Sequence, residues 1–519
     1  MFMIRDLAES PGPVQELFAD VLVIGAGIAG LLTAIRLARA GKNVVVAESG
    51  GWVQHGEEHP LNEVEQLSDV YAGARAGRFR CLGGTSTRWG GAMLPFQAAD
   101  FTVIRSDWSA EWPISLDDLL PYLSEVEQLF KLGNGPYDFP EIMTGAFLAR
   151  RAKWPEFRLR NLGTALREEI RSQTGPQVWL NATATQFAFD PSGALASVTM
   201  RCEGGGVLSV KAREFVIAAG AIESTRLLLL ADRQHGDRIF SPDGVLGGYF
   251  YDHLSAPLAT LVETRPKELN RLIGFSFEGR MMRNLRFEPS AELRADRDIA
   301  AGFVHIMGAT DEPGGFDALR EVYRKLQRRQ SPSLADIIAL GRASPWLARA
   351  IWWRFVEKRL LFPDDAEFQV HVVTEQEPRA TNRIGLSSRR VDTFGCALAT
   401  IDWKVHDDDA ANSLATTEAF AEAWNSGALR RLGRIQPNSG DEVRRKLAEG
   451  GGIYHPGGTV RMGSDVKRGV VDSDLRTFRV PNISVVSTAT FPTGGGANPT
   501  MMLMMAALRN ADRIERQLR

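Results

Sequence analysis

The chain has 519 residues, a hydrophobic fraction of 44%, a charged fraction of 24% and a formal net charge of −2. This length predicts two domains, and the composition is that of an ordinary globular protein. A net charge so close to zero offers no general attraction to nucleic acid, so we expect no nucleic-acid partner.

The cysteines and the apolar runs indicate the compartment. Cys81, Cys202 and Cys396 are widely separated and lack the spacing of a metal site. They predict a reduced, cytoplasmic location without a disulfide framework, and we expect no metal. No apolar run reaches about 18 residues, so no transmembrane segment is predicted. The N-terminal residues also lack the pattern of a signal peptide.

A nucleotide-binding pattern lies near the N-terminus. An apolar strand over residues 20–24 runs into Gly-x-Gly-x-x-Gly, formed by Gly25, Gly27 and Gly30. A helix follows, and a second apolar strand ends at Glu48. In this arrangement the glycines allow the backbone to approach a pyrophosphate, and the acidic residue binds a ribose diol. The pattern predicts a Rossmann-like unit but does not distinguish FAD from NAD.

A second glycine-rich stretch covers residues 83–93. Four glycines alternate there with hydroxyl residues and Trp89. Such a loop can lay its backbone against a flat or phosphorylated ligand. The alternative is a turn packed over Trp89.

The remaining elements predict a doubly wound sheet and a second domain. A capping-box pattern at Ser115 predicts a helix to about residue 130. A buried strand from residue 215 turns at Gly220 into another helix, which indicates a crossover packed on a sheet. Further strands are predicted at residues 178–189, 194–210, 259–263, 368–373, 383–386 and 399–405, and a helix over residues 407–432.

Residues 317–361 form a helical, locally basic stretch that contains several tryptophans. A lid, a subunit contact and a membrane-surface helix are all compatible with this composition. An ordinary amphipathic helical pair packed on the domain is the further alternative.

The C-terminal region combines one histidine with one asparagine. His455 precedes a Gly-Gly turn, and Asn498 lies between Gly496 and Pro499. A buried strand over residues 483–487 and a helix over 501–511 are predicted around them. Histidine can exchange a proton near neutral pH, and asparagine forms hydrogen bonds without competing for that proton. The alternative is that His455 caps a turn and Asn498 starts a helix.

In this order the motifs resemble those of the glucose-methanol-choline (GMC) flavin oxidoreductases. The resemblance extends over residues 21–514 and is weakest between about residues 260 and 365. It implies an α/β (α+β overall) fold with a Rossmann-like FAD-binding domain of discontinuous segments, residues 1–105, 165–255 and 445–519. It also implies a substrate domain, residues 106–164 and 256–444, with a large antiparallel sheet covered by helices.

The resemblance assigns roles to the glycine motifs. The first motif would hold the FAD pyrophosphate, Glu48 the adenosine ribose, and Ala184 would lie near the adenine. Residues 83–93 would run along the flavin, and residues 498–500 would close over its ring. The implied cofactor-binding residues are Gly25, Gly27, Ile28, Ala29, Gly30, Glu48, Ser49, Arg80, Gly83, Gly84, Ser86, Trp89, Gly90, Gly91, Ala92, Met93, Ala184, Ala219, Gly220, Pro499 and Thr500.

His455 and Asn498 match the catalytic pair of the family. The resemblance implies oxidation of an alcohol, in which His455 takes the hydroxyl proton while hydride passes to flavin N5. Asn498 would donate to the developing alkoxide. Where several members attach FAD through a histidine, this chain has Arg88, so we expect non-covalent FAD. Where the family usually carries Asp-Ala-Ser, the chain has Ser487-Thr488-Ala489, so no side-chain role is carried over to Ser487.

The form of residues 83–91 resembles the pyranose oxidase branch and its bacterial sugar and glycoside dehydrogenase relatives. A similar substrate-facing strand would carry Gln369, His371 and Gln376. Alternation places Gln369 and His371 on one face and Gln376 on the other, and a solvated sheet face is the alternative. A sugar, glycoside or polyol substrate is therefore expected.

Two other functions remain open at this point. The first is oxidation of a hydrophobic or natural-product alcohol, with residues 317–361 as an apolar lid. The second is a flavin-binding protein kept for assembly or partner binding, against which the intact His455 and Asn498 argue. The electron acceptor, whether oxygen, a quinone or a redox protein, has no motif in the sequence, and an oligomer is compatible with it.

Overall fold

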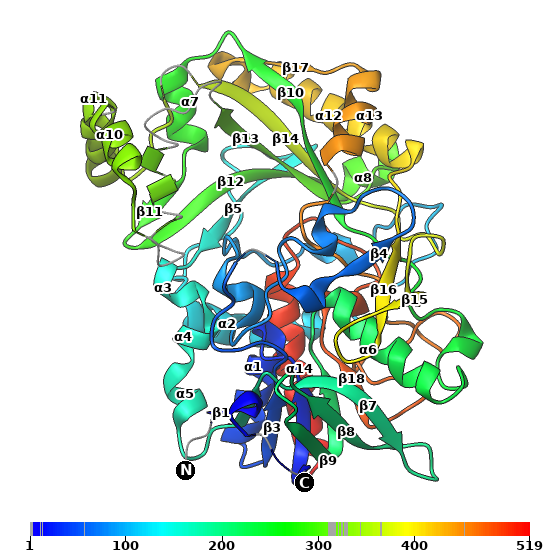
Figure 1. The fold of residues 1–519 in the computed structure, drawn as a ribbon. Helices are drawn as coiled ribbons and strands as arrows, with labels where there is room; N and C mark the ends of the chain where they lie inside the picture. Colours follow the sequence, from blue (N-terminus) through cyan, green and yellow to red (C-terminus); the bar gives the residue numbers. More distant parts are fainter. Residues whose placement is uncertain are drawn as a thin grey trace.

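The structure is a computed structural model that describes residues 4–10, 12, 14–56, 58–309, 318–319, 321–322, 325, 331–342, 344–363, 366–450 and 452–519. Two large sheets occupy opposite ends of the molecule, and both termini lie at the end formed by the first sheet (Figure 1). A small third sheet lies between them. No helix within the described ranges is long and apolar enough to cross a membrane.

The first sheet has eight strands in the order β1-β6-β3-β2-β9-β8-β7, with β18 beside β9. The strands from β1 to β9 in that order, and β18, are parallel, whereas β8 and β7 continue the sheet antiparallel. The strands are β1 (Ile4–Asp6), β2 (Gln15–Ile24), β3 (Val44–Ala47), β6 (Gln177–Leu180), β7 (Thr183–Phe189), β8 (Leu195–Arg201), β9 (Val207–Ile217) and β18 (Ile483–Val485). The predicted doubly wound core with an antiparallel extension is confirmed.

Helices bury the parallel strands. The last four residues of β2 and all of β3 are buried, as their apolar, largely β-branched sequences require when both sheet faces are covered. Helices α1 (Ile28–Arg39) and α14 (Thr500–Gln517) pack against each other beside the sheet. Helix α6 (Ala221–Gln234) follows β9 and packs on β7 and on the third sheet. The carboxyl ends of β2, β3 and β9 therefore open toward helix N-termini, where ligands bind in such sheets.

The second sheet is the large antiparallel sheet that the sequence predicts. Its order is β11-β12-β13-β14-β10-β17, with β5 beside β12. Helices α12 (Asp407–Ser426) and α13 (Gly440–Gly450) pack on β14, β10 and β17. The strands are β5 (Phe147–Trp154), β10 (His253–Val262), β11 (Ser276–Glu278), β12 (Met281–Pro289), β13 (Gly302–Ala309), β14 (Glu367–Glu375) and β17 (Arg434–Pro437).

The third sheet crosses the predicted domain division. It contains β15 (Arg383–Val391), β16 (Ala397–Asp402) and β4 (Val64–Gln66), and β4 runs parallel to β16. Residues 64–66 were assigned to the FAD-binding domain and residues 383–402 to the substrate domain, yet they form one sheet that packs on α6. The predicted boundary after residue 255 also falls inside β10, which begins at His253. Pairing between distant segments and the exact start of a strand leave no local signal in sequence.

Shorter elements connect the sheets. The helix predicted from Ser115 forms as two 3-10 turns, η6 (Leu116–Asp118) and η7 (Leu120–Tyr122), before α2 (Leu123–Phe130). The other helices are α3 (Phe157–Arg160), α4 (Leu162–Ala165), α5 (Arg167–Arg171), α7 (Pro266–Ile273), α8 (Ala291–Arg297) and the 3-10 turn η10 (Ala428–Leu432).

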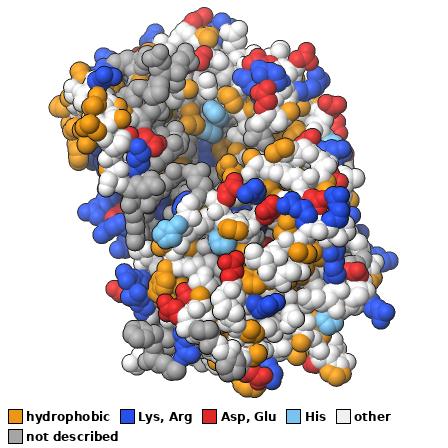
Figure 2. Space-filling model, in the orientation of Figure 1, with side chains coloured by type: hydrophobic (Ala, Val, Ile, Leu, Met, Phe, Trp, Pro, Cys, Tyr) orange, Lys and Arg blue, Asp and Glu red, His pale blue; other side chains and the backbone are white. Residues whose placement is uncertain are grey.

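A helical arm projects from the second sheet (Figure 1). It consists of α10 (Leu334–Arg342), α11 (Ser344–Trp352) and the π turn η9 (Trp353–Glu357), so the helix prediction is confirmed for this part of residues 317–361. Residues 317, 320, 323–324, 326–330 and 343 lie outside the described residues. Helix α10 buries no residue, and apolar side chains gather on the arm in Figure 2. This exposure does not fit an ordinary packed helical pair.

Candidate active site

A cavity opens at the carboxyl ends of β2, β3 and β9. Its empty volume is about 1360 Å³, part of it open to solvent. The N-termini of α1 and α6 border it, and helix N-termini favour anionic groups such as phosphates.

The two glycine motifs meet at this cavity. A Cβ atom on Gly25, whose φ is +106°, would lie 2.5 Å from the carbonyl oxygen of Ala218. A Cβ atom on Gly84, whose φ is +54°, would lie 2.9 Å from the Cα atom of Gly27. Neither position tolerates a side chain without movement, so both backbones can approach a ligand closely. The structure therefore has the cradle that a dinucleotide requires.

Glu48 supplies the carboxylate of this cradle. It is buried, and its carboxylate accepts from the backbone N–H of Ala26 at 2.8 Å and from that of Gly50 at 2.9 Å. Burial raises the pKa of Glu48, and the two backbone donors oppose that rise. Because the residue also lines the cavity, its remaining lone pairs can accept from a ribose diol.

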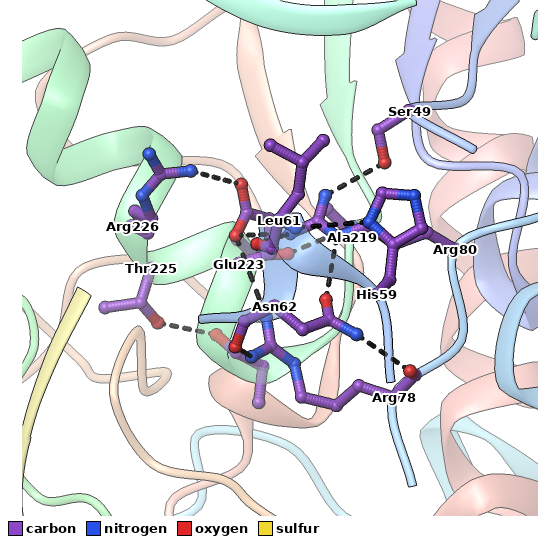
Figure 3. A network of polar contacts seen from close by, with 12 residues as sticks. Ser49, His59, Leu61, Asn62, Arg78, Arg80, Ala219, Glu223, Thr225 and Arg226 are labelled. Atoms are coloured by element: carbon purple, nitrogen blue, oxygen red, sulfur yellow. Dashed lines mark hydrogen bonds and ion pairs between the residues drawn. The ribbon is translucent and has the colours of Figure 1, made fainter. Parts of the chain in front are cut away.

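Arg80 holds three segments together around the cavity (Figure 3). Its guanidinium donates to Asn62 Oδ1 at 2.7 Å and to Ser49 Oγ at 2.9 Å, and it lies 2.9 Å from Glu223 Oε2. Glu223 is also paired with Arg226 at 3.0 Å. Burial disfavours ionisation of Glu223, but the surrounding arginines outweigh it and lower its pKa to about 2. The network fixes the walls of the site.

The structure brings twelve of the predicted cofactor residues to the cavity wall and leaves nine elsewhere. Those on the wall are Gly25, Gly27, Ile28, Ala29, Glu48, Ser49, Arg80, Gly84, Ala184, Ala219, Gly220 and Thr500. Those outside it are Gly30, Gly83, Ser86, Trp89, Gly90, Gly91, Ala92, Met93 and Pro499.

The second group has identifiable packing. A Cβ atom on Gly30 would lie 1.9 Å from the Gly25 carbonyl oxygen, so this glycine serves contact between turn and helix. Trp89 Nε1 donates to the carbonyl of Arg160 at 2.8 Å, and Met93 N donates to that of Lys153 at 2.9 Å. In the structure residues 89–93 thus pack against β5 and the segment after it.

Some wall residues were not found from sequence. Asn62, Arg78, Phe79, Glu223 and Tyr454 line the cavity. Asn62, Arg78 and Phe79 lie between or beside the motifs, in a polar stretch without periodicity. Glu223 follows Gly220 by one helical turn, and this closeness to a predicted cofactor residue could have identified it from the sequence.

His455 and Asn498 lie side by side, as the sequence predicts. His455 Nε2 is 3.2 Å from Asn498 Nδ2, and both side chains keep partial exposure. Burial first, and then His253 and Arg286, lower the pKa of His455 well below its usual 6.5. A neutral imidazole and an amide therefore converge where one substrate oxygen can contact both.

Residues from the second sheet surround this pair. His253, at the start of β10, places its Nδ1 atom 3.3 Å from His455 Nδ1 and its Nε2 atom 2.8 Å from the Gly495 carbonyl oxygen. Arg286, on β12, donates from Nη2 to Asn498 Oδ1 at 2.9 Å. Neither residue was predicted from the sequence, because each lies about 200 residues from its partner with no motif around it.

Asp252 holds the histidine turn. Its carboxylate accepts four hydrogen bonds, from the backbone N–H of His253, Tyr454 and His455 and from the hydroxyl of Tyr71. Asp252, His253 and His455 place potential metal-ligand atoms within 4.8 Å of one another. Because both carboxylate oxygens already accept two hydrogen bonds each, the geometry is that of a backbone clamp.

The three residues predicted to face the substrate do not lie together in the structure. Gln369 and His371 are partly exposed on β14, and His371 stacks on His305 of β13 with ring centroids 5.2 Å apart. Gln376 is buried elsewhere: it accepts from Trp403 Nε1 at 2.7 Å and donates to the Lys404 carbonyl at 2.7 Å. The structure therefore does not bring Gln376 to the site, because its amide is used in packing α12 against the sheet.

Comparison with known proteins shows which family the chain resembles. Residues 378–507 match the model described as GMC oxidoreductase, and residues 20–55 match the FAD binding domain. The resemblance to the GMC oxidoreductases is thereby confirmed. It is 24% identical to 2-methyl-1,2-propanediol dehydrogenase of Mycolicibacterium austroafricanum, over 96% of this chain and 95% of the relative. It is 26% identical to 6'''-hydroxyparomomycin C oxidase of Streptomyces lividus, over 98% and 93%.

A solved structure shares the fold. Pyridoxine 4-oxidase from Mesorbium loti superposes with a TM-score of 0.58 at 17% identity, over 95% of this chain and 99% of that one. The superposition confirms the α/β fold, and the match to the FAD binding domain confirms FAD as cofactor. The glycine cradle, Glu48 and the helix N-termini of this chain fit FAD in the cavity.

Proposed function

We propose that this FAD-dependent GMC oxidoreductase oxidises a hydroxyl group of a sugar, glycoside or polyol. The observation that carries the proposal is the 3.2 Å separation of His455 Nε2 and Asn498 Nδ2. A hydroxyl oxygen that lies beside both nitrogen atoms can donate its proton to the imidazole and accept a hydrogen bond from the amide in place of their mutual contact.

The two residues have different tasks. His455 takes the hydroxyl proton as a general base, since its lowered pKa keeps it neutral at neutral pH. Asn498 donates to the same oxygen, and that bond strengthens as negative charge grows in the transition state. FAD, when bound, supplies the hydride acceptor.

Polar groups around the pair support a polyhydroxylated substrate. Arg286 is hydrogen-bonded to Asn498, and burial and Arg286 together with His371 lower the pKa of His305 to about 3, so these groups share one region. His371 adds a partly exposed imidazole on the same strand face as Gln369. The relatives named for a propanediol and for an aminoglycoside are compatible with this class.

Non-covalent binding of FAD is part of the proposal. Of the described residues that line the cavity, none is histidine or cysteine. Arg88, which stands where several family members attach FAD, lies over the ring of Phe79 with its guanidinium carbon 4.7 Å from the centroid. A guanidinium in that position offers no ring nitrogen for a flavin link.

The test uses the purified, FAD-loaded protein. Acid precipitation should release all flavin into the supernatant, and colour retained in the pellet would contradict non-covalent binding. Dye reduction is then measured with sugars and polyols beside aliphatic and aromatic alcohols. We expect turnover with the first group, and loss of turnover with unchanged FAD content in His455→Ala.

Other outcomes are equally informative. Turnover confined to hydrophobic alcohols would overturn the sugar assignment and favour the apolar alternative. Full FAD content without reduction by any alcohol would favour a flavin-binding protein kept for partner binding. An unchanged rate in His455→Ala would remove the catalytic role of the pair.

A further inference from the structure

A continuous hydrogen-bond chain runs through both catalytic side chains. It passes from Arg286 to Asn498, His455 and His253, and ends at the carbonyl of Gly495. We propose that His253 is a positioning residue that sets the tautomer of His455 and thereby leaves Nε2 as the free base. The proposal rests on the proposed function and adds a residue to it.

The first end of the chain fixes the amide. A guanidinium can only donate, so the Asn498 atom that meets Arg286 Nη2 at 2.9 Å must be Oδ1. The atom facing His455 Nε2 at 3.2 Å is therefore Nδ2, which can only donate. His455 Nε2 must accept this bond, so it carries the lone pair.

The other end gives the same answer independently. A carbonyl can only accept, so His253 Nε2, 2.8 Å from Gly495 O, carries a proton. His253 is fully buried, and burial lowers its pKa to about 4, which leaves it neutral with a lone pair on Nδ1. The atom 3.3 Å away, His455 Nδ1, must therefore be the donor. Both ends require the tautomer with the proton on Nδ1 and the base on Nε2.

The surroundings leave His253 one orientation. Its ring meets that of His455 at 89°, with centroids 5.2 Å apart. A Cβ atom on Gly494 would lie 3.1 Å from the His253 ring, so the glycine loop packs directly on it. Gly495 N donates to Glu375 Oε2 at 2.7 Å, and Asp252 Oδ1 accepts from the backbone N–H of both histidines. The ring therefore links the turn that carries His455 to the loop that carries Asn498.

This arrangement also prepares the site for proton transfer. When Nε2 takes the substrate proton, Nδ1–H already points at an acceptor, so the imidazolium gains a stronger hydrogen bond without reorganisation. Of the charged groups, Arg286 acts on both rings and Asp100 on that of His253, while Asp252 accepts from the backbone N–H of both residues. Glu375 accepts from Gly495 N, and Tyr71 donates to Asp252.

Two substitutions separate the two nitrogens of His253. In His253→Asn the amide oxygen can replace Nδ1 as acceptor, but the residue is too short to reach Gly495. In His253→Gln the amide nitrogen can replace Nε2 as donor to Gly495, but the acceptor for His455 is lost. Both variants lose the ring, and His253→Asn loses more side-chain volume, so a smaller rate loss in His253→Asn cannot come from better packing.

The kinetic readout is flavin reduction by substrate in FAD-loaded protein. We expect His253→Gln to lower the rate constant by about 10-fold to 100-fold, as loss of an orienting partner does elsewhere, with little change in KM. His253→Asn should retain most of the rate. Equal losses in both variants, or a larger loss in His253→Asn, would overturn the proposal. His235→Gln is the control, because His235 also meets a carbonyl, that of Phe187 at 2.9 Å, far along α6 from the site.

The structural readout needs no turnover. Long-range nitrogen–proton NMR of histidine-labelled, FAD-loaded protein reports which ring nitrogen of each of the 8 histidines is protonated. The signal missing in His455→Ala assigns the residue. We expect Nδ1–H at His455, and an Nε2–H tautomer in the wild-type protein would overturn the proposal. An enzyme inactive on every alcohol would instead contradict the proposed function and leave this result standing.

Discussion

His455 is partly exposed, and burial, His253 and Arg286 all lower its pKa below 6.5. In the proposed role of general base it must be neutral, so activity is expected above its pKa and is lost as the pH falls through it. We expect the rate constant for flavin reduction to stay level from alkaline pH down to 6.5. Anaerobic stopped-flow measurements across pH test this expectation. A protonation midpoint at or above 6.5 would contradict it.

The carboxyl group of Asp252, which holds the histidine turn, titrates close to that pH range. Burial raises the pKa of Asp252 to about 6, and protonation would weaken the clamp on the histidine turn. A decline centred near pH 6 should therefore disappear in Asp252→Asn, whereas a decline caused by His455 should remain.

Asn498 is the second residue with a defined contribution. Asn498→Asp removes the N–H donor to the substrate oxygen and places a negative charge beside it. Because loss of one such donor costs about 100-fold to 1,000-fold in rate, we expect a fall of that size with FAD content unchanged. Asn438→Asp is the control, since the Asn438 side chain donates to the Pro257 carbonyl, at 3.2 Å, outside the site. A loss below about 10-fold would exclude a donor role of this strength.

At the scale of elements, the segment after β4 that carries Arg80 is joined to helix α6 by one buried charge network. Glu223 on α6 is paired with Arg80 and Arg226, and both side chains of each pair are at most 10% exposed. Glu223→Gln leaves these arginines partly uncompensated, which costs about 3 to 5 kcal/mol for a buried pair. We expect a lower thermal midpoint and weaker FAD retention. Glu58→Gln, which breaks an exposed pair with Arg75, should cost less than about 1 kcal/mol.

The pH dependence of this network has a definite sign. The pKa of Glu223 is lowered from 4.5 to about 2, so its contribution to stability is complete above pH 4.5. It is lost as the pH falls from 4.5 toward 2. The wild-type protein should therefore lose its advantage over Glu223→Gln in that interval, as measured by thermal unfolding at each pH.

For the whole molecule, the sequence correctly predicted those features that a short run of residues determines. The strand-glycine-helix motif, Glu48, His455 and Asn498 lie in short segments whose chemistry is visible in sequence. The structure places Glu48 on the cavity wall and His455 beside Asn498, and Tyr454 and Pro456, the neighbours of His455, also line the cavity. His253 and Arg286 come from strands of the second sheet, and pairing alone brings them to the site. For the same reason, the sequence predicted neither the pairing of β4 with β16 nor the packing of the loop at Trp89 against β5.

The cavity wall draws on segments from residue 24 to residue 503, so FAD should stabilise the chain as a unit. A ligand that binds only the folded state adds about 2.7 kcal/mol at 100 times its Kd. We expect the thermal midpoint to rise with FAD concentration, followed by circular dichroism and by tryptophan fluorescence together.

Gly84→Ala should reduce this rise, because its φ of +54° and the 2.9 Å approach to Gly27 leave no room for a methyl group. Gly193→Ala is the control: its φ is +86°, but no atom lies within 4 Å of the added Cβ and the residue is outside the cavity. It should lower stability with and without FAD equally, whereas a midpoint independent of FAD in the wild-type protein would contradict the shared cavity.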